Sequence, residues 1–200
     1  VVGPAQIKPP QSLKDWWRFV PNGLQHTNYE VSPLSIRKHT KKVGIRPVDF
    51  DRGEKVLVVL PGPIAACYYG LNLKTLKKDI LCNIQKHTDR EIVFREKDPG
   101  GKKAKAKQRM RTHQFWKCLE LGDVHCTVTW GSVASVESVL YGIPSIPLNP
   151  CAASHVCSDT LADIENPTFP SDGARSSWLE WLSRESISRS EIDALIEKLR

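Results

Sequence analysis

Residues 124–150 read VHCTVTWGSVASVESVLYGIPSIPLNP, and this stretch decides the fold that the sequence predicts. The apolar residues 124–129 are typical of a buried strand, which ends before Gly131 and Ser132. Apolar residues then recur at helical spacing as far as Gly142, and residues 143–148 return to an extended pattern. The stretch therefore predicts a β-α-β crossover with a small-residue turn at the carboxyl end of its first strand. Ligands of open α/β sheets bind at such turns, because glycine allows close approach and the N–H groups of a helix start attract anions.

The alternation of strand and helix extends towards the N-terminus. Residues 55–60 (KVLVVL) form an apolar run that suits a buried parallel strand, and a Pro-Gly-Pro turn closes it. The pattern then predicts a helix from Asn72 to about His87, a strand over residues 91–95 and a helix near residues 104–121. This order predicts an α/β protein with a doubly wound parallel sheet, a single Rossmann-like unit with right-handed crossovers.

The composition indicates one main domain, since 200 residues with 40% hydrophobic content can bury one good-sized core. We expect an irregular lead-in over residues 1–54 packed on the core, a Rossmann-like domain over residues 55–165, and C-terminal helices that pad it over residues 166–200. Ser188, with Glu191 three residues later, has the spacing of a capping box and predicts the start of the final helix. Neither a signal-peptide layout nor a run of eighteen apolar residues is seen, so we expect a cytoplasmic protein without membrane contact.

The net charge and the cysteine spacing limit the classes of ligand that the sequence predicts. The formal net charge of +7 favours phosphorylated or polyanionic ligands. Much of the excess lies in one run of cations, Lys102, Lys103, Lys105, Lys107, Arg109 and Arg111. This run is either a solvated loop or an arm that binds phosphates, and in the second case Lys103 to Arg111 would contact nucleic acid. The six cysteines include no C-x-x-C pair, which fits reduced core thiols, and we expect no metal and no cofactor.

A parallel sheet would gather four loops at its carboxyl edge. Arg95 would supply a bidentate hydrogen-bond donor, Lys97 a compact positive charge, and Ser132 with the neighbouring N–H groups a set of uncharged donors. This combination suits a diphosphate. The substrate-binding residues predicted at this edge are Gly62, Arg95, Lys97, Thr129, Gly131 and Ser132, with Asn149 and the turn at residues 151–154 beside them.

Glu137 lies on the helix after the turn, five residues before Gly142. Its carboxylate could accept two hydroxyls of a ribose whose phosphates lie at the helix start. The alternative is an ordinary surface glutamate on an amphipathic helix, and spacing alone favours that alternative.

The run GSVASVESVLYGIPSI resembles the nucleotide-sugar-binding half of GT-B glycosyltransferases, in which a Gly or Ser turn precedes a helix bearing Glu and then Gly-x-Pro. The resemblance implies that Glu137 holds the ribose of the donor and that Gly131 and Ser132 hold its phosphates. The turn also resembles that of capsule-type Kdo and sialic acid transferases, and the longer layout is similar to tailed-phage proteins labelled as glycosyltransferases. Two positions depart from these patterns: Thr129 stands where retaining enzymes often have a second Glu, and Glu96-Lys97 replaces the His-Pro pair of the capsule group.

The resemblance implies transfer of a sugar from a nucleotide-sugar to a hydroxyl, with modified DNA as an acceptor and the host cytoplasm as the location. Glu96 and Asp98 are the carboxylates nearest the predicted edge and are the candidate catalytic bases. His125 lies in a buried strand and is expected to be a core histidine, and Trp130 either stacks on a base or packs. Only one Rossmann-like half is evident, so the acceptor-binding half is reduced to residues 1–54, supplied by a partner subunit or a second copy of the chain, or absent. The alternative is a non-catalytic phage protein that binds nucleotides, nucleic acid or a host partner.

Overall fold

A four-stranded parallel sheet forms the centre of the protein. The computed structural model describes residues 16–17, 53–95, 115, 119, 123–184 and 187–188. The strands are β2 (Lys55–Val59), β3 (Ile92–Arg95), β4 (Val124–Thr129) and β5 (Ser145–Pro147), in the spatial order β3-β2-β4-β5. Every neighbouring pair is parallel. The predicted α/β class with its parallel sheet is thus confirmed.

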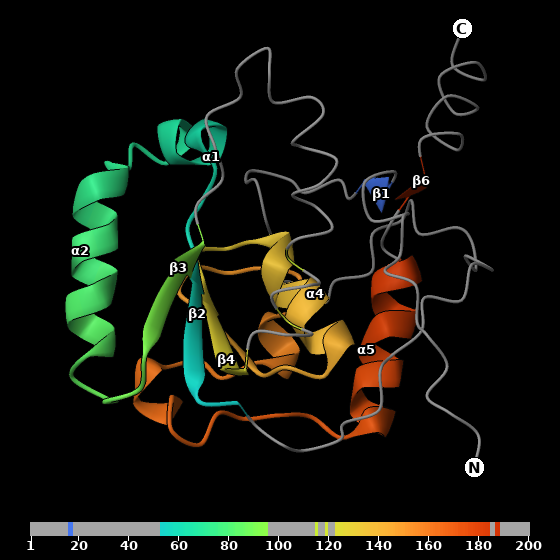
Figure 1. Cartoon of the computed structure of the whole chain (residues 1–200). Helices are drawn as coiled ribbons and strands as arrows, with labels where there is room; N and C mark the ends of the chain where they lie inside the picture. The colour runs from blue at the N-terminus through green and yellow to red at the C-terminus, as the bar shows by residue number, and fades with distance from the viewer. Residues whose placement is uncertain are drawn as a thin grey trace, which may run out of the picture.

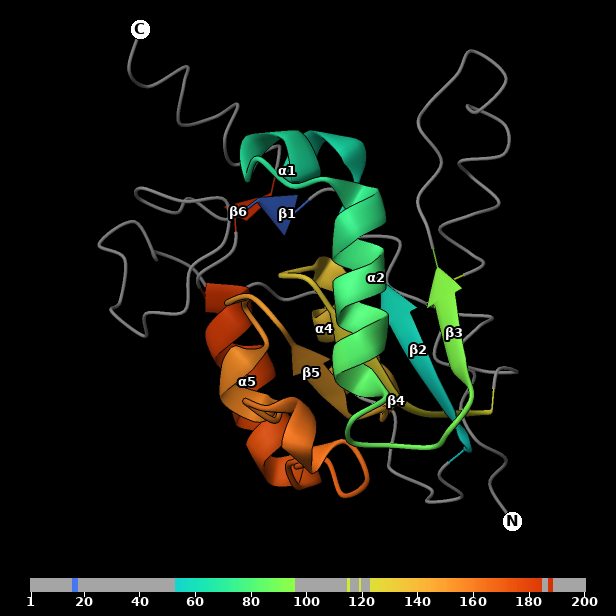
Figure 2. The same cartoon turned by 90° about the vertical axis from the view of Figure 1, so that its left-hand side faces the viewer.

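Helices cover both faces of the sheet, as Figures 1 and 2 show. Helix α2 (Leu73–Ile84) packs on one face, and α4 (Val133–Tyr141) lies on the other, with α5 (Asp172–Arg184) beyond it. Alternate residues of β2 serve the two faces, with Val56 and Val58 in the core towards α2 and Leu57 and Val59 in the core towards α4. Burial of each such side chain stabilises the fold by about 1.5–3 kcal/mol.

The helix ends follow from local chemistry. Asn72 caps α2, its Oδ1 accepting hydrogen bonds from the N–H groups of Lys74 and Thr75 at 3.0 and 3.2 Å. This helix ends at Ile84, three residues before the predicted His87. Helix α4 ends at Tyr141, and the next residue, Gly142, has a φ of 87° and closes the last turn in the left-handed conformation that glycine tolerates.

A short helix, α1 (Pro63–Tyr68), follows β2 where the sequence predicted only a turn. Proline is favoured at the first position of a helix, because its fixed φ suits the helix and its missing N–H would have no partner there. Helix α1 lies across the carboxyl edge of the sheet, above the arrowheads of β2 and β3 (Figure 1).

The chain after β5 covers the outer edge of the sheet. It contains two short 3-10 helices, η2 (Ser154–Val156) and η3 (Leu161–Asp163), and the N–H of Ser158 donates to the carbonyl of Ser145 in β5. The buried Arg175 then fastens α5 to α4, because its Nη1 donates to the carbonyl of Val139 at 3.1 Å and its Nη2 pairs with Asp172.

Two predicted helices lie largely outside the described residues. In the region of residues 104–121 the structure describes Phe115 and Leu119, which are helical and buried. Ser188 belongs to β6 (Ile187–Ser188), which pairs antiparallel with β1 (Trp16–Trp17). The predicted helix after Ser188 and most of the lead-in over residues 1–54 lie outside the description. No described helix combines the length and the apolar character needed to cross a membrane.

Candidate ligand site at the carboxyl edge

The register of the sheet aligns the ends of all four strands. Val59 is level with Arg95 on one side and with Thr129 on the other, and Thr129 is level with Pro147. Strand spacing of about 4.8 Å separates Arg95 from Thr129 by roughly 10 Å along this row. The chain leaves β2 towards one face and β4 towards the other, so the point where the strand order reverses lies between these two strands. Ligands of open α/β sheets bind at that point.

The turn after β4 is closely packed against the loop after β5. Gly131 has a φ of 48°, in the left-handed region where a side chain is strained. A Cβ atom on this residue would lie 3.0 Å from Nδ2 of Asn149 and 3.3 Å from the carbonyl oxygen of Pro150. Glycine is therefore required here both for its conformation and for the close approach of the two loops.

Hydrogen-bond donors gather at this turn. Ser132 caps α4: its Oγ accepts from the N–H of Ala134 at 3.2 Å, and its carbonyl accepts from the N–H of Ser135 at 3.0 Å. Within the part of the chain that the structure describes, the N–H groups of Gly131, Ser132 and Val133 have no hydrogen-bond partner. The buried indole Nε1 of Trp130 likewise has none among the described residues. Donors grouped in this way at the start of a helix suit an anion such as a phosphate.

Buried hydroxyl groups connect β4, α4 and β5 directly beneath the turn. Oγ1 of Thr127 lies 3.0 Å from Oγ of Ser138 and 2.9 Å from Oγ of Ser145, and Ser145 donates to Ser135 at 3.0 Å. Oγ1 of Thr129 completes the chain at 2.5 Å from Oγ of Ser135. All five side chains are at most 1% exposed. Because every member is bonded, the set holds the start of α4 in one position over the strand ends.

Thr129 contributes to the site from inside the protein. The sequence placed its side chain among the ligand contacts, but that side chain is 1% exposed and its hydroxyl bonds Ser135. Its carbonyl accepts from the N–H of Leu148 at 2.7 Å. Thr129 therefore supports the turn from below, whereas Gly131 and Ser132 are partly exposed at the edge.

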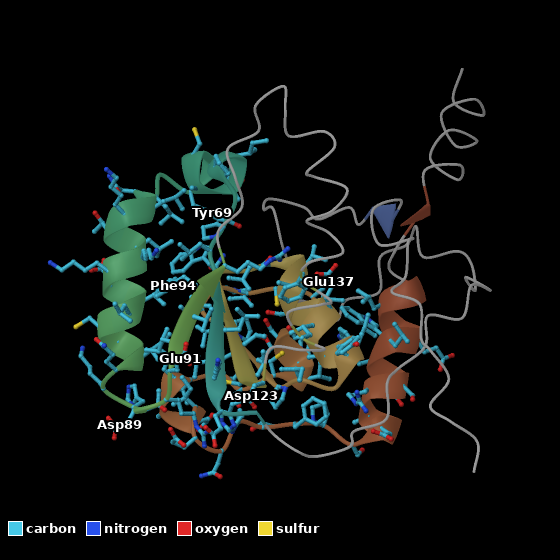
Figure 3. The ribbon with its side chains drawn as sticks, in the orientation of Figure 1. Tyr69, Asp89, Glu91, Phe94, Asp123 and Glu137 are labelled. Carbon is cyan, nitrogen blue, oxygen red and sulfur yellow. The ribbon has the colours of Figure 1, made fainter. Side chains whose placement is uncertain are left out.

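The other predicted contacts are distributed around the edge. Gly62 precedes α1, and its carbonyl accepts from the N–H of Ala66 at 2.9 Å. The guanidinium of Arg95 stacks over the ring of Phe115, with 4.7 Å between the guanidinium carbon and the ring centroid. Such stacking holds the cation at the end of β3. Glu137 is half-buried midway along α4 (Figure 3).

Several candidates lie outside the described residues. These are the candidate bases Glu96 and Asp98, the cation Lys97, and the basic run with Lys103, Lys105, Lys107, Arg109 and Arg111. The structure therefore brings Gly62, Arg95, Gly131 and Ser132 to one edge and leaves the roles of the others as predictions.

Sequence reasoning missed the support beneath the turn. Ser135 and Ser138 are spaced three residues apart on α4 and face Thr127 and Ser145. The available signal was small polar residues at helical spacing, next to threonines that alternate along the strand before them. His125 follows its prediction, since it is 2% exposed and its Nε2 lies 2.8 Å from the carbonyl oxygen of Ile164.

The thiol of Cys157 is held in its protonated form. Burial raises the pKa of the Cys157 thiol well above its ordinary value, and neighbouring Cys151 and Asp159 raise it further. Among the described cysteines, Cys126, Cys151 and Cys157 are buried thiols, and Cys67 and Cys82 are exposed thiols. The expectation of reduced thiols thus agrees with the described cysteines, although two of them lie at the surface.

Comparison with protein-family models, with curated proteins and with solved structures gave no match for this chain.

Proposed function

We propose that the protein is a glycosyltransferase of GT-B type that binds a nucleotide-sugar at the carboxyl edge, between β2 and β4. The observation that carries the proposal is the group of N–H donors at residues 131–133, which have no partner among the described residues and lie where the strand order reverses. The resemblance of this run to GT-B donor-binding sequences supports the same ligand.

The proposed binding mode assigns one chemical task to each group. The N–H groups at the start of α4 bind the donor phosphates, and Arg95 adds a positive charge from the end of β3. Glu137 accepts hydrogen bonds from the ribose hydroxyls, as the GT-B resemblance implies.

Transfer then follows from positioning and charge stabilisation. A hydroxyl oxygen of the acceptor bonds to the anomeric carbon, and the bond from that carbon to the phosphate oxygen breaks. The phosphate keeps the electron pair, and the hydroxyl proton passes to a carboxylate, for which Glu96 and Asp98 are the candidates by sequence. Donors already fixed where negative charge develops lower the barrier without reorganisation.

The test is calorimetry with UDP, CMP and GDP on paired variants. Ser132→Ala and Ser171→Ala each remove a serine cap whose Oγ accepts from an alanine N–H at 3.2 Å, at α4 and near the start of α5. Each should cost about 0.5–2 kcal/mol of stability. Only Ser132→Ala should weaken nucleotide binding. Glu137→Ala should reduce affinity by about 1–3 kcal/mol through loss of hydrogen bonds to a charged group, with Glu180→Ala on α5 as its control.

The results decide between the two functions. Failure of all three nucleotides to bind, or equal affinity of the two serine variants, would contradict the proposed donor site. Binding without release of sugar from the matching nucleotide-sugar in the presence of acceptors would favour the non-catalytic alternative.

A further inference from the structure

Helix α1 turns its largest apolar side chains towards solvent. Ile64 is 87% exposed, Tyr68 59% and Tyr69, directly after the helix, 37%, whereas Ala66 is the residue buried against the protein. Isolated exposed hydrophobic residues are common on protein surfaces, but three within six positions form a patch. Helix α1 lies at the carboxyl edge of the sheet (Figure 1), with Tyr69 there in Figure 3, and the candidate ligand site lies at this same edge.

The two tyrosine rings are arranged for stacking. Their centroids are 5.1 Å apart and their planes meet at 88°, so the edge of one ring meets one face of the other. This arrangement leaves ring faces that the pair itself does not cover. Stacking of a nucleic-acid base on an exposed ring is tolerant of sequence, because every base has a π-face.

Cations follow the aromatic residues without an intervening acid. Lys74 and Lys78 are exposed and lie one turn apart on α2, and Lys77 lies between them with its Nζ 4.8 Å from the ring centroid of Phe94. The first turn of α2 contains no acidic residue. Lysine near a helix start opposes the helix dipole, so its position there is not explained by helix stability.

Lys74, Lys77 and Lys78 share the first two turns of α2 with one exposed acidic residue, Asp79. Figure 3 shows Asp89, Glu91 and Asp123 at the amino edge of the sheet, away from α1. The carboxyl edge near α1 therefore combines stacking surface with positive charge.

We propose that α1 and the first two turns of α2 bind single-stranded nucleic acid, with bases stacked on Tyr68 and Tyr69 and phosphates paired with Lys74 and Lys78. Charge complementarity selects a polyanion, and the two rings select one whose bases are unpaired. A membrane surface is less well matched, because Ile64 is the one exposed aliphatic residue of α1 and membrane helices present a long apolar face. The inference rests on the proposed function in one respect: it makes the bound nucleic-acid strand the acceptor of the transferred sugar.

The test measures fluorescence anisotropy of a labelled fifteen-nucleotide oligo-dT with the full chain. Tyr68→Ala should weaken binding about 5- to 150-fold, and Tyr68→Phe, which keeps the ring, should bind like the parent. Val93→Thr, at an exposed position of β3, is the control for surface apolar area.

Charge is tested on the same helix. Lys74→Gln and Lys78→Gln should each reduce the slope of log affinity against log salt by about 0.7. Lys86→Gln, just after α2 at the amino edge, should leave the slope unchanged. The thermal midpoint of each variant checks that the fold is retained.

Three results would overturn the inference: no binding of the oligonucleotide, equal binding by Tyr68→Ala and the parent, or binding of phosphatidylserine vesicles that depends on Ile64 in place of oligonucleotide binding. Nucleotide binding in calorimetry is measured on the same tyrosine variant and should not change. If the parent protein fails to bind a nucleotide, that result counts against the donor site alone. If the parent protein fails to bind the oligonucleotide, that result counts against the α1 surface alone.

Discussion

Substitution of Gly131 by alanine tests whether the turn after β4 is held as tightly as its geometry indicates. The added Cβ has two separate costs. One is conformational, because φ is 48°. The other is steric, because Asn149 Nδ2 lies 3.0 Å and the carbonyl oxygen of Pro150 lies 3.3 Å from the new atom. The amide of Asn149 can rotate away, but the Pro150 carbonyl is part of the backbone and must shift with its loop.

A Gly70→Ala variant separates the conformational cost from the steric cost. Gly70 has a φ of 63°, and a Cβ added there would meet nothing within 4 Å. Alanine in the left-handed region costs about 1–2 kcal/mol, from which a gain of about 0.4–1 kcal/mol is subtracted because alanine restricts the unfolded chain. Gly70→Ala should therefore destabilise the protein by about 1 kcal/mol. Gly131→Ala carries the same balance plus overpacking of about 1–3 kcal/mol, for a total of about 2–4 kcal/mol.

Urea unfolding of the parent and both variants, followed by circular dichroism, gives the two free-energy differences. The loss at Gly131 should exceed the loss at Gly70 by at least about 1 kcal/mol, at unchanged dependence on urea. Equal losses at the two positions would refute the conclusion that the loops after β4 and β5 are in obligatory contact. That result would also remove the basis for a fixed phosphate-binding turn.

Two further predictions concern ionisable groups. The hydrogen bond from Thr88 and the pairing with Arg90 lower the pKa of Glu165 below its ordinary value of 4.5. The stability that this carboxylate contributes is therefore complete above pH 4.5 and is lost as the pH falls through the lower pKa of the folded state. Glu165→Gln should thus lower the thermal midpoint at pH 7 and reduce the fall of the midpoint below pH 4.5. Glu91→Gln, which breaks an exposed ion pair with Lys55, should do neither. Identical pH profiles of the thermal midpoint for the two variants would contradict this account. Because burial raises the pKa of Cys157, iodoacetamide at pH 8 should modify the exposed Cys67 and Cys82 first and Cys157 only after unfolding, and peptide mapping by mass spectrometry that found early modification of Cys157 would be evidence against it.

The sheet could be predicted because its burial is encoded locally. Residues 55–60 and 124–129 are apolar on both faces, as strands covered on both sides must be, and the helical spacing between strands indicates parallel crossovers. Helix α1 was missed for a physical reason: six residues are too few for a periodicity, and a Pro-Gly-Pro run is equally typical of a turn. The predicted strand at residues 143–148 is shorter in the structure because Pro144 has no N–H for the sheet, and β5 begins at Ser145.

The candidate site was predictable only in part. Gly131 and Ser132 could be placed because a glycine turn before a helix has few other geometries. The alignment of Arg95, Val59 and Thr129 depends on the register between strands, which apolar runs without alternation do not specify. The exposed tyrosines of α1 were unpredictable for a related reason, since a helix too short to show a face gives no indication of which residues it buries.

The buried hydroxyl groups beneath the turn at residues 131–133 have a physical advantage over apolar side chains at the same positions. Apolar side chains at Thr127, Ser135 and Ser145 would fill the same space but would allow α4 to slide along β4, since dispersion contacts have no preferred direction. Hydroxyl bonds of 2.9–3.0 Å between these residues fix the helix start relative to the strand end in both distance and orientation. The N–H groups at residues 131–133 are then held in place before any ligand arrives. A phosphate would meet donors that need no rearrangement, which is the condition under which fixed dipoles contribute most to binding and to stabilisation of a leaving group.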